Sequence, residues 1–306
     1  ELVALARERE LSLGFQIQQT LLVGELPERV GRASLAAYVE PSAGIDGDFY
    51  EFTRLGDDLF DLAVGDVMGK GIPAALIGAG VKQQLAKATP TTQPTPMEPA
   101  AIVNQVHAQL YDNLVEVASF VTFAYFRFDL SAGSVTFVDA GHTKAVLSRA
   151  DKTRLLEGQN LPLGVLGDEH YRQHTVEWQP GDVLLLYSDG LTEAMNTSGE
   201  MFGTERLSAL VSRLRAAQVP ASVLTQAIRQ EIRRFLDGSA PNDDSTCIAV
   251  AYDTEGPALA ELQLPRRESE MTALRAGIAQ AARAVGLDED AVQALVLAVS
   301  ETGANI

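Results

Sequence analysis

Four short acidic segments stand out because their residue types suit metal-dependent chemistry. They occupy residues 47–50, 65–71, 188–193 and 242–246 of a 306-residue chain. Each adjoins an apolar run typical of a β-strand, so carboxylates at several strand ends could converge in space. Aspartate oxygens are the ligands that Mg²⁺ and Mn²⁺ prefer, whereas zinc and iron sites favour histidine and thiolate. Because the chain has one cysteine and four histidines, the pattern predicts a magnesium or manganese site.

The chemistry available to such a site is metal-assisted hydrolysis. Two divalent ions about 4 Å apart can share a bridging carboxylate, activate one water and offset the charge of a bound phosphate. No protein nucleophile is then required, which suits a chain whose serines, cysteine and histidines form no convincing triad. A single Gly-Asp or Asp-Gly pair is a common turn former. The four segments together, each at a strand end, are far more specific.

The elements that must position these segments follow from the hydrophobic periodicity. Strands are predicted at residues 36–39, 49–52, 59–64, 119–130, 134–139, 145–148, 183–187 and 246–252. Helices are predicted at residues 73–85, 100–115, 204–217 and 221–236. Strands interleaved with two pairs of helices indicate an α+β fold in which helices cover the outer faces of the sheets.

Both ends of the chain differ from this pattern. Residues 1–24 carry apolar side chains at three- and four-residue steps, which predicts a helix. Two interpretations stay open: the helix covers its own domain, or it is a coiled-coil-like signalling stalk that forms a homodimer. A composition break at residues 253–257 precedes a predicted strand and two helices. We therefore predict a linker helix at 1–25, a main domain at 26–253 and an incomplete second domain at 258–306.

Composition excludes several classes of function. The net charge of −17 argues against non-specific binding to nucleic acid and otherwise indicates a soluble protein. No run approaches the roughly 18 apolar residues of a membrane helix, and no signal peptide is visible. Cys247 lies in an apolar run and is predicted to be a buried hydrophobe; a lone cysteine fits a cytoplasmic protein. Because the chain begins with Glu1, we expect it to be a fragment.

Motifs in a fixed order then point to a family. The relevant stretches are residues 16–22, 46–50, 65–76, 140–142, 161–164, 180–194, 202–203 and 243–246. They resemble the bacterial branch of the metal-dependent PPM protein serine/threonine phosphatases, the group that contains the sporulation phosphatase SpoIIE and the stress-response phosphatase RsbU. The resemblance implies a four-layer α-β-β-α sandwich of two mainly antiparallel sheets. It also implies a site for two Mn²⁺ or Mg²⁺ ions at one end of these sheets.

The resemblance also implies a role for each site residue. Asp66 is expected to bridge both ions, and Val67 to offer its backbone carbonyl to one of them. Asp189 and Asp243 are expected to complete the shell of the other ion. Asp48 is expected to hold metal-bound waters.

Two further aspartates receive weaker assignments. Asp244 is the less favoured member of its pair, because the ligand in the family is the first acid of that motif. Asp46 occupies a place where the bacterial branch usually has glycine. A solvated Asp46 is favoured over a water-mediated ligand, and both readings stay open.

The chain departs from the eukaryotic branch in two places. Met68 replaces the histidine of a proposed general acid, and residues 36–48 contain no basic residue that could dock a phosphate. Both absences are usual in the bacterial branch. Lys70 is a weak candidate for either role, and His142 is expected to be structural.

The C-terminal piece resembles the beginning of a GHKL-type ATPase of the anti-sigma-factor kinase kind, similar to RsbW. Glu301 and Asn305 lie four residues apart on one predicted helix face. In the corresponding motif the glutamate activates the phosphoryl acceptor and the asparagine holds magnesium. The remaining nucleotide-binding motifs are absent, so ATP with Mg²⁺ would bind only if this domain were complete.

These observations predict a manganese- or magnesium-dependent phosphatase that acts on phosphoserine or phosphothreonine of a partner protein. By resemblance, the partner is a STAS-type anti-sigma-factor antagonist, and the pathway controls a sigma factor in a stress response. The N-terminal helix would convey a signal to the helices at 72–85 and 100–115. Two alternatives remain: an inactive regulatory scaffold that binds the same partner, and a hydrolase of small phosphate esters.

Overall fold

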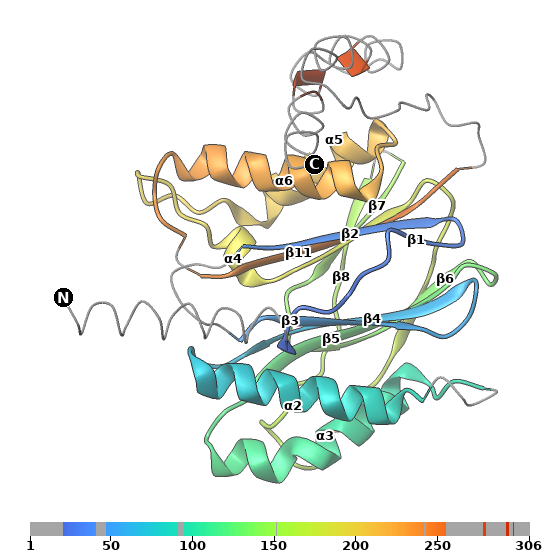
Figure 1. Cartoon of the computed structure of the whole chain (residues 1–306), viewed down its shortest axis with the longest axis vertical. Coiled ribbons are helices and arrows are strands. Elements are labelled where there is room, and N and C mark those ends of the chain that lie inside the picture. The colour runs from blue at the N-terminus through green and yellow to red at the C-terminus, as the bar shows by residue number, and fades with distance from the viewer. Residues whose placement is uncertain are drawn as a thin grey trace, which may run out of the picture.

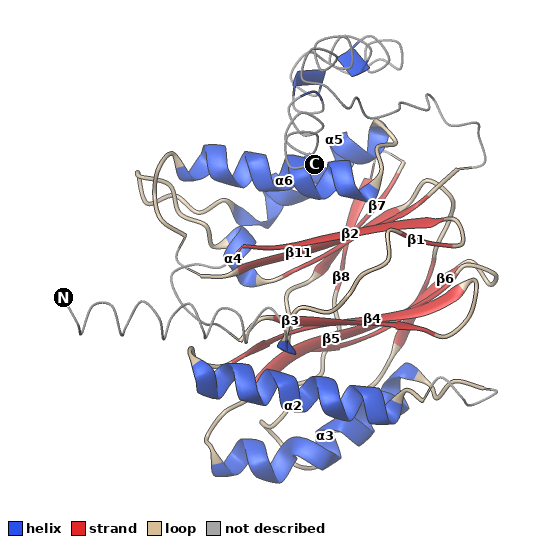
Figure 2. Cartoon of the chain, viewed as in Figure 1, coloured by secondary structure: helices blue, strands red, loops and turns tan. Residues whose placement is uncertain are grey.

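The chain forms a sandwich of two β-sheets with helices on both outer faces (Figures 1 and 2). In this computed structural model, the described residues are 21–40, 47–90, 95–150, 152–241 and 243–254, with the isolated positions 278–279, 292–293 and 296. The predicted α-β-β-α architecture is therefore confirmed. The predicted N-terminal helix and C-terminal piece lie almost entirely outside the described residues.

The first sheet has six strands in the order β1-β2-β11-β10-β7-β8. Its strands are β1 (Arg29–Val30), β2 (Ala33–Glu40), β7 (Ala145–Arg149), β8 (Lys152–Leu156), β10 (Val183–Tyr187) and β11 (Ser245–Tyr252). All of its pairs are antiparallel. β10 and β11 are buried along their whole length, because they lie in the middle of the sheet with a covered face on each side.

The second sheet has five strands in the order β3-β4-β5-β6-β9. Its strands are β3 (Phe49–Arg54), β4 (Leu59–Val67), β5 (Val121–Asp129), β6 (Ser134–Ala140) and β9 (His174–Glu177). These pairs are antiparallel as well. Short connections join β3 to β4 and β5 to β6, whereas α2 and α3 lie between β4 and β5 in the chain, and β9 pairs with β6 after the chain has passed through β7 and β8 of the other sheet.

Two pairs of helices cover the sheets. α2 (Ile72–Ala88) and α3 (Pro99–Glu116) pack on the second sheet, whereas α5 (Gly203–Ala216) and α6 (Ala221–Leu236) pack on the first (Figure 1). Proline stands in the first turn of both α2 and α3, where its missing N–H costs nothing. A short helix, α4 (Asp189–Thr192), follows β10. No helix among the described residues combines the length and apolar character needed to cross a membrane.

Three apolar layers hold these elements together. One lies between α2, α3 and the second sheet, one between the two sheets, and one between the first sheet and α5 with α6. The layer between the sheets contains Trp178 and the stacked rings of Phe60 and Phe128, whose centroids are 4.7 Å apart. Burial of such a side chain contributes about 1.5–3 kcal/mol, so this layer fixes the sheets against each other.

The sequence patterns identified the buried elements and missed the exposed ones. The four long helices agree with the prediction to within three residues at each end. β1, β8, β9 and α4 were not predicted, since β1 and α4 are very short and β8 and β9 are largely exposed edge strands. The predicted strand at 59–64 continues to Val67, because Gly65, Asp66 and Val67 pair with β5.

Candidate functional site

The hairpin of β3 and β4 carries two of the predicted site residues. Asp48 immediately precedes β3, and Asp66 is the penultimate residue of β4. Phe49 pairs with Gly65 in this hairpin, so the antiparallel register, continued by one residue, brings Asp48 opposite Asp66. The two carboxylates interact electrostatically, which agrees with this register.

The strands β10 and β11 bring together the other two residues. Tyr187 pairs with Cys247, so the segment after β10 and the segment before β11 lie side by side. Asp189 and Asp243 belong to these segments and interact electrostatically. A Cβ atom at Gly190 would lie 2.0 Å from the backbone oxygen of Asp244, so only glycine permits this approach. The predicted turn at Asp189 is the beginning of helix α4.

Hydrogen bonds join the two halves of the site across the space between the sheets. Thr246 Oγ1 donates to Asp48 Oδ2 at 2.7 Å, and the Ser188 hydroxyl also interacts with the Asp48 carboxylate. Ser188 Oγ in turn donates to the backbone oxygen of Asp244 at 3.3 Å and accepts from Thr246 N at 3.0 Å. All four acidic segments therefore meet at one end of the sandwich.

The electrostatics of this end favour a bound cation. Burial, followed by the negative charge of Asp66, raises the pKa of Asp48 well above its ordinary range. Burial, followed by the charge of Asp243, raises the pKa of Asp189. Each pair thus concentrates negative charge that a divalent cation would offset.

Two neighbouring groups complete the picture. A Cβ atom at Gly47 would lie 2.7 Å from the backbone oxygen of Val67, so that oxygen faces the segment that carries Asp48. On the other side, Lys70 Nζ forms an ion pair with Asp243 Oδ1 at 2.7 Å. Lys70 is exposed and lies in the turn between β4 and α2. A basic side chain therefore reaches from the segment after β4 in the second sheet to the segment before β11 in the first.

His142 lies beside the site and has the character of a structural residue. Its Nδ1 atom is 3.0 Å from Thr122 Oγ1, which is 3.5 Å from the backbone oxygen of Asp66. The residue is partly exposed, but its Nε2 atom is enclosed, and burial of the ring lowers the pKa of His142 to about 4. His142 is therefore neutral near pH 7. Met68, by contrast, projects into solvent.

The chemistry of the donors fits magnesium or manganese, since every candidate ligand side chain is a carboxylate. Within the described part of the chain, however, no three His, Cys, Asp or Glu side chains form a group with metal-holding geometry. The structure shows two electrostatically coupled pairs of carboxylates, Asp48 with Asp66 and Asp189 with Asp243. Asp46 lies outside the described residues. Cys247 is buried in the core, as predicted.

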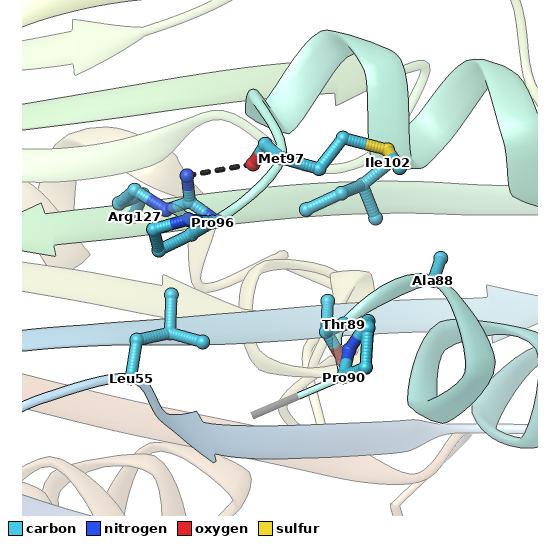
Figure 3. A pocket seen from close by; sticks show the side chains of 8 residues that line it. All are labelled: Leu55, Ala88, Thr89, Pro90, Pro96, Met97, Ile102 and Arg127. Atoms are coloured by element: carbon cyan, nitrogen blue, oxygen red, sulfur yellow. Dashed lines mark hydrogen bonds between the residues drawn. The ribbon is translucent and has the colours of Figure 1, made fainter. Parts of the chain in front are cut away.

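A small cavity elsewhere does not compete with this site. It has a volume of ≈ 10 Å³ and lies at the far end of the second sheet, between α2, α3 and Arg127 (Figure 3). Such a volume holds about one water molecule. Arg127 Nη1 donates to the backbone oxygen of Met97 at 2.7 Å, and its guanidinium pairs with the buried Asp61. These contacts tie Met97, just before α3, to β5, and the cavity is too small for a substrate.

The hydroxyl groups that support the acids were not among the site residues predicted from the sequence. Ser188 and Thr246 were recognised as motif members, but roles were assigned only to the aspartates. The available signal was their position, since Ser188 precedes Asp189 and Thr246 follows Asp244 by two residues. Small hydroxyl side chains commonly donate hydrogen bonds to buried carboxylates.

Comparisons with known proteins agree on one family. A family model described as Stage II sporulation protein E (SpoIIE) matches residues 56–253. Protein IcfG of Synechocystis is 28% identical over 264 residues, which cover 79% of this chain and 41% of IcfG. The phosphoserine phosphatase RsbU of Bacillus subtilis is 30% identical over 192 residues, which cover 62% of this chain and 55% of RsbU. The chain thus spans about half the length of these curated relatives.

Solved structures share the fold. The SiaA-PP2C domain of Pseudomonas aeruginosa superposes with a TM-score of 0.69 at 21% identity, covering 82% of this chain and 99% of that domain. RsbX, crystallised in complex with magnesium, gives a TM-score of 0.55 at 16% identity and covers 74% of this chain and 96% of RsbX. At these identities the similarity shows a PP2C-like fold and nothing finer.

Proposed function

The chain belongs to the SpoIIE family of PPM-type serine phosphatases, and from this premise we propose that it hydrolyses phosphoserine or phosphothreonine on a partner protein. The observation that carries the proposal is the presence of two coupled carboxylate pairs, Asp48 with Asp66 and Asp189 with Asp243, at one end of the sandwich. Paired carboxylates of this kind repel each other, and a bound divalent cation would offset that repulsion.

We assign two Mn²⁺ or Mg²⁺ ions to these two pairs of carboxylates. Asp66 would bridge them, with the backbone oxygen of Val67 as a further ligand. Asp189 and Asp243 would serve one ion, and Asp48 would hold coordinated water. When bound, the ions supply an activated water and offset the charge of the phosphate. The magnesium in the RsbX complex is consistent with such a requirement in proteins of this fold.

The remaining residues of the site hold the carboxylates in place. The Thr246 hydroxyl and Ser188 fix the orientation of Asp48, and the glycine at position 190 lets the Asp189 and Asp243 segments approach. Because these supports come from β11 and from the segment after β10, the acids keep their relative positions only in the folded sandwich. Such fixed placement of polar groups is what an active site requires before substrate arrives.

A protein substrate suits the surface around the site better than a small ester. Met68, Ile72 and Leu76 follow Asp66 closely along the chain and expose much of their apolar surface. Exposed apolar side chains beside a reaction centre favour contact with a macromolecule. By resemblance, we propose a phosphorylated STAS-type anti-sigma-factor antagonist as the partner, within a partner-switching pathway.

Two predictions about the chain's ends stay predictions. The N-terminal helix as a dimerising signal element and the GHKL-type piece with Glu301 and Asn305 both concern residues outside the described part. The family model ends at residue 253 and does not extend to the C-terminal piece.

An inactive scaffold that binds the same partner is the alternative, and the ion pair between Lys70 and Asp243 is the observation in its favour. A lysine that permanently occupied Asp243 would keep this carboxylate from a metal ion. Titration with Mn²⁺ separates the two functions, since a scaffold of this kind would bind no metal at millimolar concentration.

The test of the proposal replaces Asp66 or Asp189 by Asn and measures Mn²⁺-dependent hydrolysis of an aryl phosphate and of a phosphoserine protein. We expect each replacement to abolish both activities while circular dichroism and melting temperature show a folded protein. Asp57→Asn is the matched control, because Asp57 lies exposed at the opposite end of the β3–β4 hairpin. Full activity in either site variant would refute the site, and chelation by EDTA without loss of activity would refute the metal requirement.

A further inference from the structure

The side chain of Lys70 places a positive charge at the acidic end of the sandwich. It follows β4 in the chain, only four residues after Asp66, yet its Nζ atom lies 2.7 Å from Asp243 Oδ1, just before β11. The contact therefore joins the second sheet to the first. Lys70 also acts electrostatically on Asp189, so its charge faces both carboxylates of this pair.

The oxygen that Lys70 contacts is already in use. Asp243 Oδ1 also accepts a hydrogen bond from the backbone N–H of Asp244 at 3.0 Å, which orients the carboxylate toward the lysine. A divalent cation binds a carboxylate oxygen at about 2.0–2.2 Å, and an ammonium group beside that oxygen would repel it. Lys70 and a metal ion would therefore compete for Asp243 Oδ1 in this arrangement.

We propose that Lys70 is the counter-ion of Asp243 in the metal-free protein and competes with the divalent cation for this carboxylate. The inference rests on the proposed function, which makes Asp243 a metal ligand. Binding of the cation through Oδ1 then requires release of Lys70, and the ion pair raises the metal concentration at which the site fills. In the absence of metal, Lys70 lowers the repulsion between Asp243 and Asp189.

The structure offers a matched control for the charge of Lys70. Lys144 is also exposed and lies just before β7. The neighbouring Thr143 donates through Oγ1 to the backbone oxygen of Tyr187, the last residue of β10, so Lys144 lies at the same end of the sandwich as Asp189. It pairs with Glu157 instead of an acidic segment of the site. Replacing Lys144 changes the net charge by the same amount at the same end of the sandwich without removing a contact to Asp243.

The experiment compares the wild-type chain with Lys70→Met and Lys144→Met by isothermal titration calorimetry with MnCl₂. We expect Lys70→Met to bind Mn²⁺ about three- to five-fold more tightly, five-fold being the equivalent of about 1 kcal/mol, the upper end for an exposed ion pair. Lys144→Met should bind like the wild type. Equal or weaker binding by Lys70→Met, or an equal gain in Lys144→Met, would overturn the inference.

Melting temperatures give a second readout that a purely structural lysine would not produce. In EDTA, Lys70→Met should melt below the wild type, because the repulsion between Asp189 and Asp243 loses its counter-charge. In saturating MnCl₂ the difference should vanish or reverse. A deficit of the same size in both conditions would refute competition. Failure of the wild type itself to bind Mn²⁺ would instead refute the metal site of the proposed function, and with it the competition.

Discussion

Replacing Gly190 by Ala is the sharpest test of how the site is assembled. Gly190 lies in helix α4, where alanine is intrinsically preferred over glycine by about 1 kcal/mol. From local propensity alone, the substitution should stabilise the protein. In the folded chain, however, the added Cβ would lie 2.0 Å from the backbone oxygen of Asp244, whereas real Cβ atoms keep at least 3.0 Å from such an atom. The segments that carry Asp189 and Asp243 must therefore separate by about 1 Å.

The size of this displacement sets the expected effects. Metal–ligand distances tolerate only about ±0.2 Å, so a shift of this size should impair metal binding. A 1 Å misplacement can cost about 100-fold in rate, and overpacking costs about 1–3 kcal/mol of stability. We expect Gly190→Ala to lose about 100-fold in Mn²⁺-dependent aryl phosphate hydrolysis and about 1–3 kcal/mol in urea unfolding.

The control is Gly80→Ala, the same chemical change in helix α2, where the added Cβ would meet no atom within 4 Å apart from the adjacent backbone of its own helix. This variant should keep wild-type activity and gain about 0.5–1 kcal/mol of stability. Wild-type metal affinity and activity in Gly190→Ala would refute the close approach of the two acidic segments. Equal losses in both variants would show that the effect does not come from that contact.

Three further changes test other parts of the structure. Arg127→Met leaves the buried Asp61 without its counter-ion and should lower the free energy of unfolding in urea by about 3–5 kcal/mol. Adding Asp61→Leu to this variant should restore most of the loss. No recovery in the double variant would contradict the ion-pair account. Thr246→Val removes a donor to the buried Asp48 and should cost about 1–3 kcal/mol by the same assay, whereas an unchanged midpoint would show that the bond is dispensable. Burial lowers the pKa of His142 from 6.5 to about 4. Between these pH values the unfolded chain binds a proton at His142 and the folded chain does not, so the free energy of unfolding falls as the pH drops from 6.5 toward 4. His142→Gln should lack this loss of at most about 3 kcal/mol, and coincident pH profiles of unfolding would refute the assignment.

The carboxylate character of the candidate site could be predicted from the sequence because it depends on residue types. A chain with few histidines, one cysteine and aspartates at four strand ends can offer a metal ion little besides carboxylate oxygen. The buried strands were equally visible, since continuous apolar runs such as Val183–Tyr187 report burial directly. The edge strand Lys152–Leu156 could not be predicted in this way, because an exposed strand needs no apolar pattern and is defined by its pairing with β7.

Tertiary structure alone decided which acids are neighbours. The register of β3 with β4 brings Asp48 opposite Asp66, and the pairing of β10 with β11 joins the Asp189 and Asp243 segments across more than fifty residues of sequence. Strand register and sheet packing are long-range properties that no local motif encodes. The four acidic segments could thus be recognised in the sequence as a set of candidate ligands. Their division into two pairs, the support from Thr246 and the approach of Lys70 to Asp243 arise only when the two sheets pack face to face.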